Sequence, residues 1–475
     1  MSGTICFVRR GLLLAPLFAA LAARAQSLPN LFPIPNGTGL LETYNIGGGP
    51  IALSGPFFQA LGTNGRSCAS CHQPAQGWSV SADELKLRFL LTQGRDPVFR
   101  TNDGSNCDHN IDTSTLSGRR NAYSLLLNRG LIRVTMPVPA NAEFEVVGVV
   151  NPYGCSDTAT LSMYRRPLPA ANLRFLSAVM WDGRESSTQT GTQPLKLANN
   201  PADLMADLAH QALDATAGHA QGTTPLTAEQ QQAIVAFEMA LATAQAYDYQ
   251  AGPLNSGGAT GGPVTLGTQT VPAFFLGIND PLGGNPRGTA FTPMIFNLFD
   301  AWANAPSNGS IPQRRRASIA RGQESNEFNS RPINITNVAG LNDDLNMAVI
   351  PGTCGTCHDT PNAGNHSLAL AINIGVSDTD STLDVSYLPV ITLRNKLTHE
   401  IRTTTDPGRA LVTGLWKDVG KVKGPVLRGL ASRAPYFHNG SAASLDDILS
   451  FYDKRFAIGF TAQERADLVA FLNAL

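Results

Sequence analysis

Two copies of one short cysteine and histidine pattern stand in this sequence, at Cys68-Ala69-Ser70-Cys71-His72 and at Cys354-Gly355-Thr356-Cys357-His358. Each copy reads C-x-x-C-H, which is the attachment pattern of a c-type haem. The two sulfurs bond to the haem, and the histidine ligates its iron. A zinc site would need more cysteine or histidine ligands at ligand spacing, and neither copy has them. The sequence therefore predicts two covalently bound haem c groups.

The beginning of the chain has the pattern of a secretory signal peptide. Arg9 and Arg10 precede an apolar run from Gly11 to Ala23, and small residues follow before Gln26. This run is too short for a lasting membrane anchor. We therefore expect residues 1–25 to be a signal peptide and the mature chain to be exported to the periplasm, where c-type haems are attached. Nothing after residue 26 is apolar enough to span a bilayer.

The remaining cysteines suggest a disulfide bond. Cys6 leaves with the signal peptide, and four cysteines hold the haems. Cys107 and Cys155 are left, and in an oxidising compartment we expect them to pair. Two free thiols are the alternative.

Composition and periodicity predict a mainly α fold with long loops. The chain has a net charge of -1, and charged residues make up 15% of it, so it has no signature of a nucleic-acid or anionic-membrane partner. The 45 glycines and 31 prolines indicate many turns, and strand-like alternation is scarce. Helical periodicity is clearest at 227–246 and 461–475, and in the second segment Thr461 and Glu464 form a predicted capping box.

A predicted helix precedes each haem motif, at 57–61 and at 317–326. Small haem c domains are helical and carry the motif just after an N-terminal helix. We therefore expect two such domains with inserted segments, one at 26–305 and one at 306–475. The last helix of the second domain is expected to pack back on the first.

Three further segments carry a resemblance to a known family. They are Arg120-Asn121 before an apolar run, Met180-Trp181-Asp182-Gly183-Arg184, and Leu427-Arg428 through Ala434-Pro435-Tyr436-Phe437-His438-Asn439-Gly440. In their order and spacing they resemble the bacterial di-haem cytochrome c peroxidase and MauG superfamily. The family versions read F-W-D-G-R and L-R-n-…-P-Y-F-H-D-G.

This resemblance implies unequal roles for the two haems. His72 would be the proximal ligand of the peroxidatic haem, and His358 would ligate a second haem that relays electrons. The other ligand of that second haem stands fourteen residues after His438, which is Tyr452. Classical members have methionine there, whereas MauG has tyrosine. A phenolate favours higher iron oxidation states than a thioether does. The alternative for Tyr452 is an ordinary aromatic on a helix face.

The resemblance also implies a bridging residue and a metal ion. Trp181 corresponds to the tryptophan that lies between the two haems, although a buried tryptophan can also serve packing alone. A calcium ion between the domains would be held by the side chain of Asn121 and the main-chain carbonyls of Arg433 and Pro435, since Ca²⁺ prefers oxygen ligands.

The distal side of the first haem departs from the family. No histidine occurs from Gln73 to Asp108, so we expect this haem to rest without a sixth histidine ligand. Gln193 and Asp203 stand where the family has its glutamine and its acid/base glutamate. Peroxide heterolysis needs such a proton donor and acceptor. Asp203 can also be read as a helix-capping residue after Pro201. His210 and His219 are weaker substitutes.

These features predict a periplasmic cytochrome-c peroxidase of class EC 1.11.1. It would reduce hydrogen peroxide to water, with electrons relayed from the C-terminal to the N-terminal haem and high-valent iron shared by both. Its donor would be a small cytochrome c, a cupredoxin or a quinol-linked donor, and its assembly a monomer or a homodimer. The alternatives are a MauG-like enzyme that oxidises a partner protein, a di-haem oxygenase related to rubber oxygenases, and a non-enzymatic electron carrier.

Overall fold

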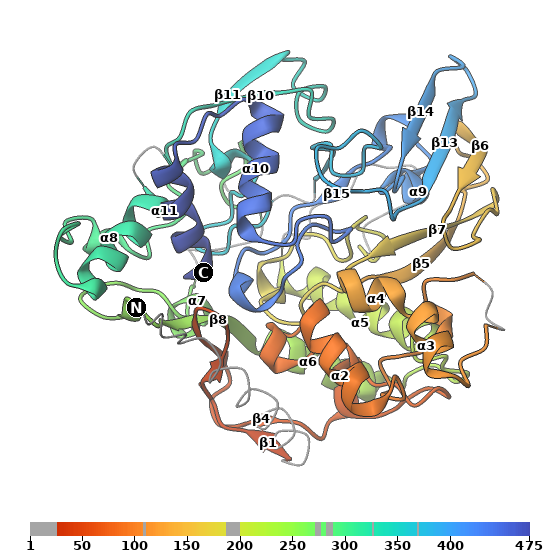
Figure 1. The fold of residues 1–475 in the computed structure, drawn as a ribbon, viewed down its shortest axis with the longest axis horizontal. Helices are drawn as coiled ribbons and strands as arrows, with labels where there is room; N and C mark the ends of the chain where they lie inside the picture. The colour runs from red at the N-terminus through yellow and green to blue at the C-terminus, as the bar shows by residue number, and fades with distance from the viewer. Residues whose placement is uncertain are drawn as a thin grey trace, which may run out of the picture.

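A computed structural model describes residues 26–107, 111–186, 200–270, 277–281, 288–324, 327–367 and 370–475 (Figure 1). The predicted signal peptide at 1–25 and the predicted site residue Gln193 lie outside these described residues. Among the helices of the described ranges, none has both the length and the apolar character needed to cross a membrane.

The fold is mixed, because the chain is 30% helical and 17% strand. The prediction of a mainly α fold is therefore wrong. The helices are α2 (Ala82–Thr92), α3 (Leu116–Ala122), α4 (Ser124–Arg129), α5 (Pro201–Gly218), α6 (Ala228–Met239), α7 (Pro263–Gly267), α8 (Ile311–Gln323), α9 (Ala410–Thr413), α10 (Leu445–Phe456) and α11 (Ala462–Asn473).

The strands are short and belong to several small sheets. They are β1 (Ser27–Leu28), β2 (Ile34–Pro35), β3 (Gly39–Asn45), β4 (Ile51–Ala52), β5 (Ile132–Pro137), β6 (Phe144–Val150), β7 (Thr160–Arg165), β8 (Leu241–Asp248), β9 (Gly252–Pro253), β10 (Ile333–Thr336), β11 (Val349–Gly352), β12 (Ala371–Ile372), β13 (Val390–Asn395), β14 (Ile401–Thr404) and β15 (Val422–Lys423). Several are rich in valine, isoleucine and threonine, the residues that suit a pleated, half-buried surface.

One strand lies inside a segment that the sequence predicts as helix. The helical pattern at 227–246 becomes α6, which ends at Met239, and β8 begins two residues later. β8 pairs antiparallel with β3 in the sheet β2-β3-β8-β9. The hydroxyls of Thr43 and Thr243 are 2.9 Å apart across this pair. Pairing with a strand about 200 residues away therefore overrides the helix propensity of the alanines in β8.

The first haem motif lies in a short 3-10 helix at Cys68–Ser70. The predicted helix before it is a single 3-10 turn, Pro56–Phe58, whose Phe57 is buried. Around the motif, α5 packs on α6, and Phe57, Trp78 and Phe237 form an aromatic cluster in which Trp78 meets both phenylalanines edge to face. The ring of Phe57 also lies 6.1 Å from the ring of His72.

The second haem motif lies in the 3-10 helix Cys354–Thr356, beside a core built from α8, α10 and α11. α8 and α11 pack closely, and a Cβ at Gly322 would lie 2.1 Å from the carbonyl oxygen of Asp467. The capping box predicted at the start of α11 is confirmed, because Thr461 and Glu464 exchange side-chain and main-chain hydrogen bonds. Figure 1 shows α8 and α11 on one side of the molecule.

Segments on the two sides of residue 305 are interleaved. β6 pairs with β13 in the sheet β14-β13-β6, on the side of Figure 1 opposite to α8. In addition, the amide of Gln245 in β8 donates to the carbonyl of Leu475, the last residue of the chain, at 3.3 Å. The C-terminal end of the chain thus contacts a strand on the N-terminal side of residue 305.

Cys107 and Cys155 form a disulfide bond with a Cα–Cα distance of 5.2 Å. Cys107 precedes α3, and Cys155 lies between β6 and β7. The bond therefore joins the segment before α3 to the segment between β6 and β7, and the amide of Cys107 adds a hydrogen bond to the carbonyl of Tyr153 at 3.3 Å.

Candidate functional site

The first haem motif opens into a largely apolar cavity of about 170 Å³. This is roughly ten times the space that one water molecule needs. Cys68, Cys71 and His72 line it together with side chains from β5, from α5 and from the segment around Trp181. A concave, mostly apolar cavity with a few polar groups is typical of a cofactor site.

His72 is oriented for iron ligation by its own hydrogen bond. Its Nδ1 lies 2.9 Å from the carbonyl oxygen of Trp78, which accepts the Nδ1 proton and leaves Nε2 free. Burial lowers the pKa of His72, so the imidazole stays neutral, as a metal ligand requires. Trp78 is fully buried, and its indole nitrogen donates to the hydroxyl of Thr43 at 2.9 Å. The residues present therefore fit a haem c at this site.

The second haem motif faces a similar cavity of about 210 Å³. Its lining includes Cys354, Cys357, His358 and Tyr452. The Nδ1 of His358 lies 2.7 Å from the carbonyl oxygen of Gly364, and burial lowers the pKa of the ring. The same arrangement as at His72 thus leaves Nε2 of His358 available, and this site also fits a haem c.

Tyr452 projects into the second cavity from α10, which begins with a capping box formed by Ser444 and Asp447. Its ring lies 6.3 Å from that of Phe437 and 6.3 Å from that of Phe456. Burial raises the pKa of the phenol. No methionine is among the described residues that line this cavity. The structure thus brings Tyr452 into the same cavity as His358.

The two cavities share a wall. The residues that line both are Arg166, Pro167, Leu168, Pro169, Trp181 and Lys423. The indole nitrogen of Trp181 donates to the carbonyl of Arg166 at 2.8 Å, and the carbonyl of Trp181 accepts from the amide of Lys423 at 2.8 Å. Trp181 is therefore held between the two candidate haem sites by one hydrogen bond of its indole and one of its carbonyl.

Buried ion pairs fix the residue after Trp181. Asp182 is fully buried and pairs with Arg165 and with Arg184. Arg165 also binds Asp406 from the C-terminal half, with Nε at 2.7 Å from Oδ2. Despite burial, these two guanidinium groups hold the pKa of Asp182 well below its usual range. The W-D-G-R segment is thus attached to both halves of the chain.

Comparison with known proteins finds partial matches to cytochrome-c peroxidases. Over 142 residues the chain is 31% identical to the cytochrome-c peroxidase IdrP1 of Denitromonas iodatirespirans, a match that covers 26% of this chain and 36% of that protein. Over 151 residues it is 30% identical to IdrP1 of Pseudomonas sp. (strain SCT), covering 27% and 38%. Both matches support the predicted resemblance to the bacterial di-haem cytochrome c peroxidases. The predicted resemblance is confirmed.

The similarity to these peroxidases is partial. The chain matches little more than a third of the length of the curated relatives. A solved structure described as a MauG-like protein associated with microbial copper homeostasis aligns with 88% of this chain and 85% of its own, with a TM-score of 0.34 and 16% identity. That likeness is too weak to carry an argument. No family model matches the chain.

The acid/base residue predicted from the peroxidase pattern lies at the start of α5. The side chain of Asn200 caps α5 by accepting from the amide of Asp203 at 3.0 Å, and its Nδ2 donates to Oδ2 of Asp203 at 2.7 Å. Asp203 is not among the described residues that line the first cavity. The structure therefore shows Asp203 in helix capping and does not bring it beside His72.

Two other acidic groups line the first cavity, and the sequence analysis missed both. Glu238, at the end of α6, is 6% exposed, and burial raises its pKa to about 8. Asp103 pairs with Arg66 and lies 3.0 Å from Nδ1 of His219, and these partners lower its pKa. His219, named above as a substitute acid/base, also lines this cavity. Only tertiary packing reveals these groups, since neither carboxylate lies in a recognisable motif.

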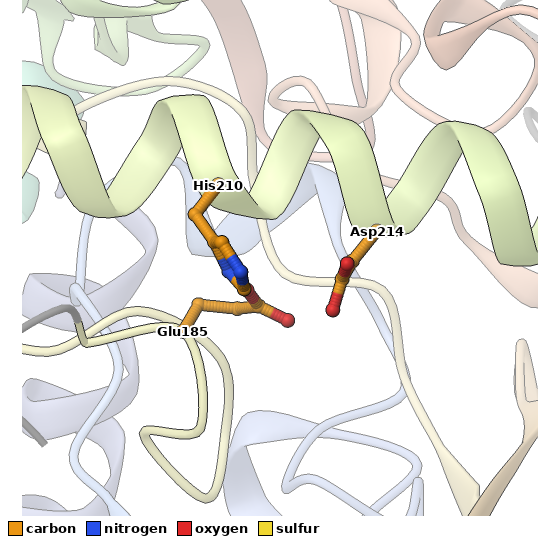
Figure 2. Close-up of side chains that lie close together, drawn as sticks. All are labelled: Glu185, His210 and Asp214. Carbon is orange, nitrogen blue, oxygen red and sulfur yellow. The ribbon is translucent and has the colours of Figure 1, made fainter. Parts of the chain in front are cut away.

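A further cluster stands at α5, close to Arg184. Figure 2 shows His210 and Asp214 of α5 pointing toward Glu185. Nδ1 of His210 lies 2.7 Å from Oε2 of Glu185, and the ligand atoms of all three residues lie within 4.8 Å of one another. Burial raises the pKa of Glu185, and the hydrogen bond raises that of His210. Both shifts favour the protonated forms of the pair.

The calcium site implied by the peroxidase resemblance would use a carbonyl oxygen that already has a partner. The carbonyl of Arg433 accepts a hydrogen bond from the guanidinium of Arg166 at 2.8 Å. Asn121 is exposed on α3, whereas Arg433 and Pro435 are buried. A carbonyl that already binds a cation is a poor ligand for a second one, so the residues present do not fit a calcium ion.

Proposed function

We propose that this protein is a periplasmic di-haem c-type peroxidase that reduces hydrogen peroxide to water. The observation that carries the proposal is the shared wall, because Trp181 lies between two cavities that each contain a haem-attachment motif. Such a wall gives electrons a short protein path from one haem to the other. The similarity to cytochrome-c peroxidases supports the same chemistry.

Each residue group has a distinct task in this proposal. When bound, haem c supplies a redox-active iron that can bind peroxide. His72 would hold the first iron as a neutral imidazole, and the sequence from Gln73 to Asp108 offers no second histidine. The reduction consumes two electrons and two protons for each peroxide. Electrons would enter at the second haem from a small cytochrome c, a cupredoxin or a quinol-linked donor.

The protons require groups that hold them at neutral pH. Glu238 lines the first cavity, and with a pKa of about 8 its carboxyl is mostly protonated at pH 7. Its Oε2 is buried without a hydrogen-bond partner in the described structure. His219 is about a third exposed and contacts Asp103, so its ring lies between solvent and the cavity. Glu238 and His219 are therefore the proton-handling groups of the proposal.

Tyr452 supports a second candidate function. If its phenolate ligates the second iron, that haem favours higher oxidation states than a methionine-ligated haem does. Both irons could then share oxidising equivalents, as a MauG-like enzyme that oxidises a partner protein requires. The observation that favours this function is the presence of Tyr452 and His358 in one cavity from which methionine is absent among the described residues.

Steady-state peroxide consumption with a reduced cytochrome c or an artificial donor tests the primary proposal. We expect turnover by the wild-type protein and a loss of at least about 100-fold in His72→Gly, because the iron then lacks its ligand. The matched control is His399→Asn, which changes an exposed histidine outside both cavities. No turnover by the haem-loaded wild type with any of these donors would contradict the peroxidase function. Oxidation of a partner protein without donor turnover would favour the second candidate.

A further inference from the structure

The guanidinium of Arg166 sits among main-chain oxygens at the wall between the two cavities. Its Nη2 donates to the carbonyl of Val80 at 2.5 Å and to that of Arg433 at 2.8 Å. Its Nη1 donates to the carbonyl of Arg129 at 3.2 Å. The residue is 6% exposed. One buried cation thus binds three main-chain oxygens.

These oxygens come from segments that are distant in the sequence. Val80 follows the first haem motif, Arg129 ends α4, and Arg433 belongs to the C-terminal half. The main chain of Arg166 extends the connection, since its amide donates to the carbonyl of His438 at 2.7 Å and its carbonyl accepts from the indole of Trp181. Arg166 therefore links the first haem segment, the bridging tryptophan and the C-terminal half.

A calcium ion in a protein does the same kind of work, because it joins carbonyl and side-chain oxygens from separate segments. The calcium site implied by the family resemblance would use the carbonyl of Arg433, which is one of the oxygens that Arg166 binds. The guanidinium of Arg433 adds a second buried positive charge close to Arg166. Two cationic groups repel a divalent cation from this position.

The backbone leaves room for the guanidinium of Arg166 at Gly130. Gly130 follows α4 with a φ of 62°, and a Cβ there would lie 2.3 Å from Nη1 of Arg166. Any larger residue at 130 would meet the guanidinium as well as an unfavourable backbone conformation. The glycine at position 130 therefore leaves the space that the guanidinium of Arg166 occupies.

We propose that the guanidinium of Arg166 acts as a built-in cation in place of the calcium ion that the family resemblance implies, and that it holds the N-terminal and C-terminal segments together at the wall between the haems. This role does not depend on the reaction that the haems perform. It predicts a di-haem protein whose stability does not depend on calcium.

Metal analysis and thermal unfolding of the haem-loaded wild type test the proposal directly. We expect fewer than about 0.1 calcium ions per chain after purification in calcium-containing buffer. We also expect the same Tm and the same haem absorption spectrum with 1 mM CaCl2 and with 1 mM EGTA. One tightly bound calcium per chain, or a Tm that falls on chelation, would overturn the proposal. This measurement needs no variant.

Two variants test the bridging role. Arg166→Met should lower Tm by at least 5 °C more than Arg174→Met, the control. Arg174 also donates to two carbonyls, those of Gly267 and Gln269, but both lie on the N-terminal side of residue 305. Gly130→Ala should lower Tm more than Gly48→Ala, since Gly48 also has a positive φ but nothing within 4 Å of a Cβ. Arg166→Met and Gly130→Ala proteins no less stable than their controls would refute the bridging role.

Discussion

The indole nitrogen of Trp181 donates to the carbonyl of Arg166 at 2.8 Å, and both residues line both haem cavities. The same stretch of chain therefore positions the candidate electron-transfer residue and the cation that connects the two halves of the fold. Asp182, the residue after Trp181, is held by ion pairs with Arg165 and Arg184. This relationship leads to the first prediction, which concerns the tryptophan itself.

Trp181→Phe should slow charge transfer between the haems by at least about tenfold. Stopped-flow absorbance can follow how fast oxidising equivalents from one equivalent of peroxide reach the second haem. Trp302→Phe is the control, because the indole of Trp302 also donates to a carbonyl, that of Ser256 at 2.9 Å, but lines neither cavity. Each variant loses one buried hydrogen bond, worth about 1 kcal/mol. Equal transfer rates in the two variants would remove Trp181 from the path.

Tyr452→Phe should change the absorption spectrum of the second haem and raise its reduction potential, because an anionic ligand is lost. Spectroelectrochemistry of the haem-loaded protein measures both. Tyr436→Phe is the control, since Tyr436 lines the same cavity but its hydroxyl donates to the carbonyl of Leu430 at 2.9 Å. A second-haem spectrum that is identical in wild type and Tyr452→Phe would show that Tyr452 is not a ligand.

Asp182→Asn should lower the free energy of unfolding by about 3–5 kcal/mol, because it leaves the buried Arg165 and the adjacent Arg184 with one anion fewer. Denaturant unfolding of the haem-loaded protein measures this change. Glu145→Gln removes an ion pair to Arg394 whose side chains are 43% and 45% exposed, and should cost at most about 1 kcal/mol. Similar losses in both variants would mean that the buried network does not stabilise the W-D-G-R segment.

Glu238 should make the protein less stable as the pH rises. Its pKa is about 8 in the folded protein and ordinarily 4.5, so the folded state binds the proton more tightly than the unfolded state does. The stabilisation that comes from this tighter proton binding is fully present below about pH 4.5. It is lost as the pH rises to about 8, which lowers the free energy of unfolding by up to about 5 kcal/mol.

Chemical denaturation between pH 5 and pH 8 measures how steeply the free energy of unfolding falls as the pH rises, which is the slope in question. Glu238→Gln should flatten it, because the amide does not titrate. Glu229→Gln, on the exposed side of the same helix, should leave it as in the wild type. A Glu238→Gln protein with the wild-type slope would mean that another group accounts for the pH dependence.

Local patterns in the sequence were sufficient where the chemistry is local. The cap at Thr461 and Glu464 involves residues three apart, and it was predicted correctly. The pairing of Cys107 with Cys155 followed from counting the cysteines that other chemistry leaves over, and the structure has that bond. In contrast, β8 was read as helix because its alanines favour helix, while its partner β3 lies about 200 residues earlier.

The amino-acid sequence by itself determined the two haem-attachment motifs, the family relationship and the position of the tryptophan segment, because these depend on residue types at short, characteristic spacings. The tertiary structure decided the mixed fold, the shared wall with Trp181 and Lys423, the burial of Glu238 and the cation position of Arg166. Each of these arises from contacts between segments that are far apart in the chain. Burial and long-range hydrogen bonds set charge and orientation, and no short pattern in the sequence encodes them.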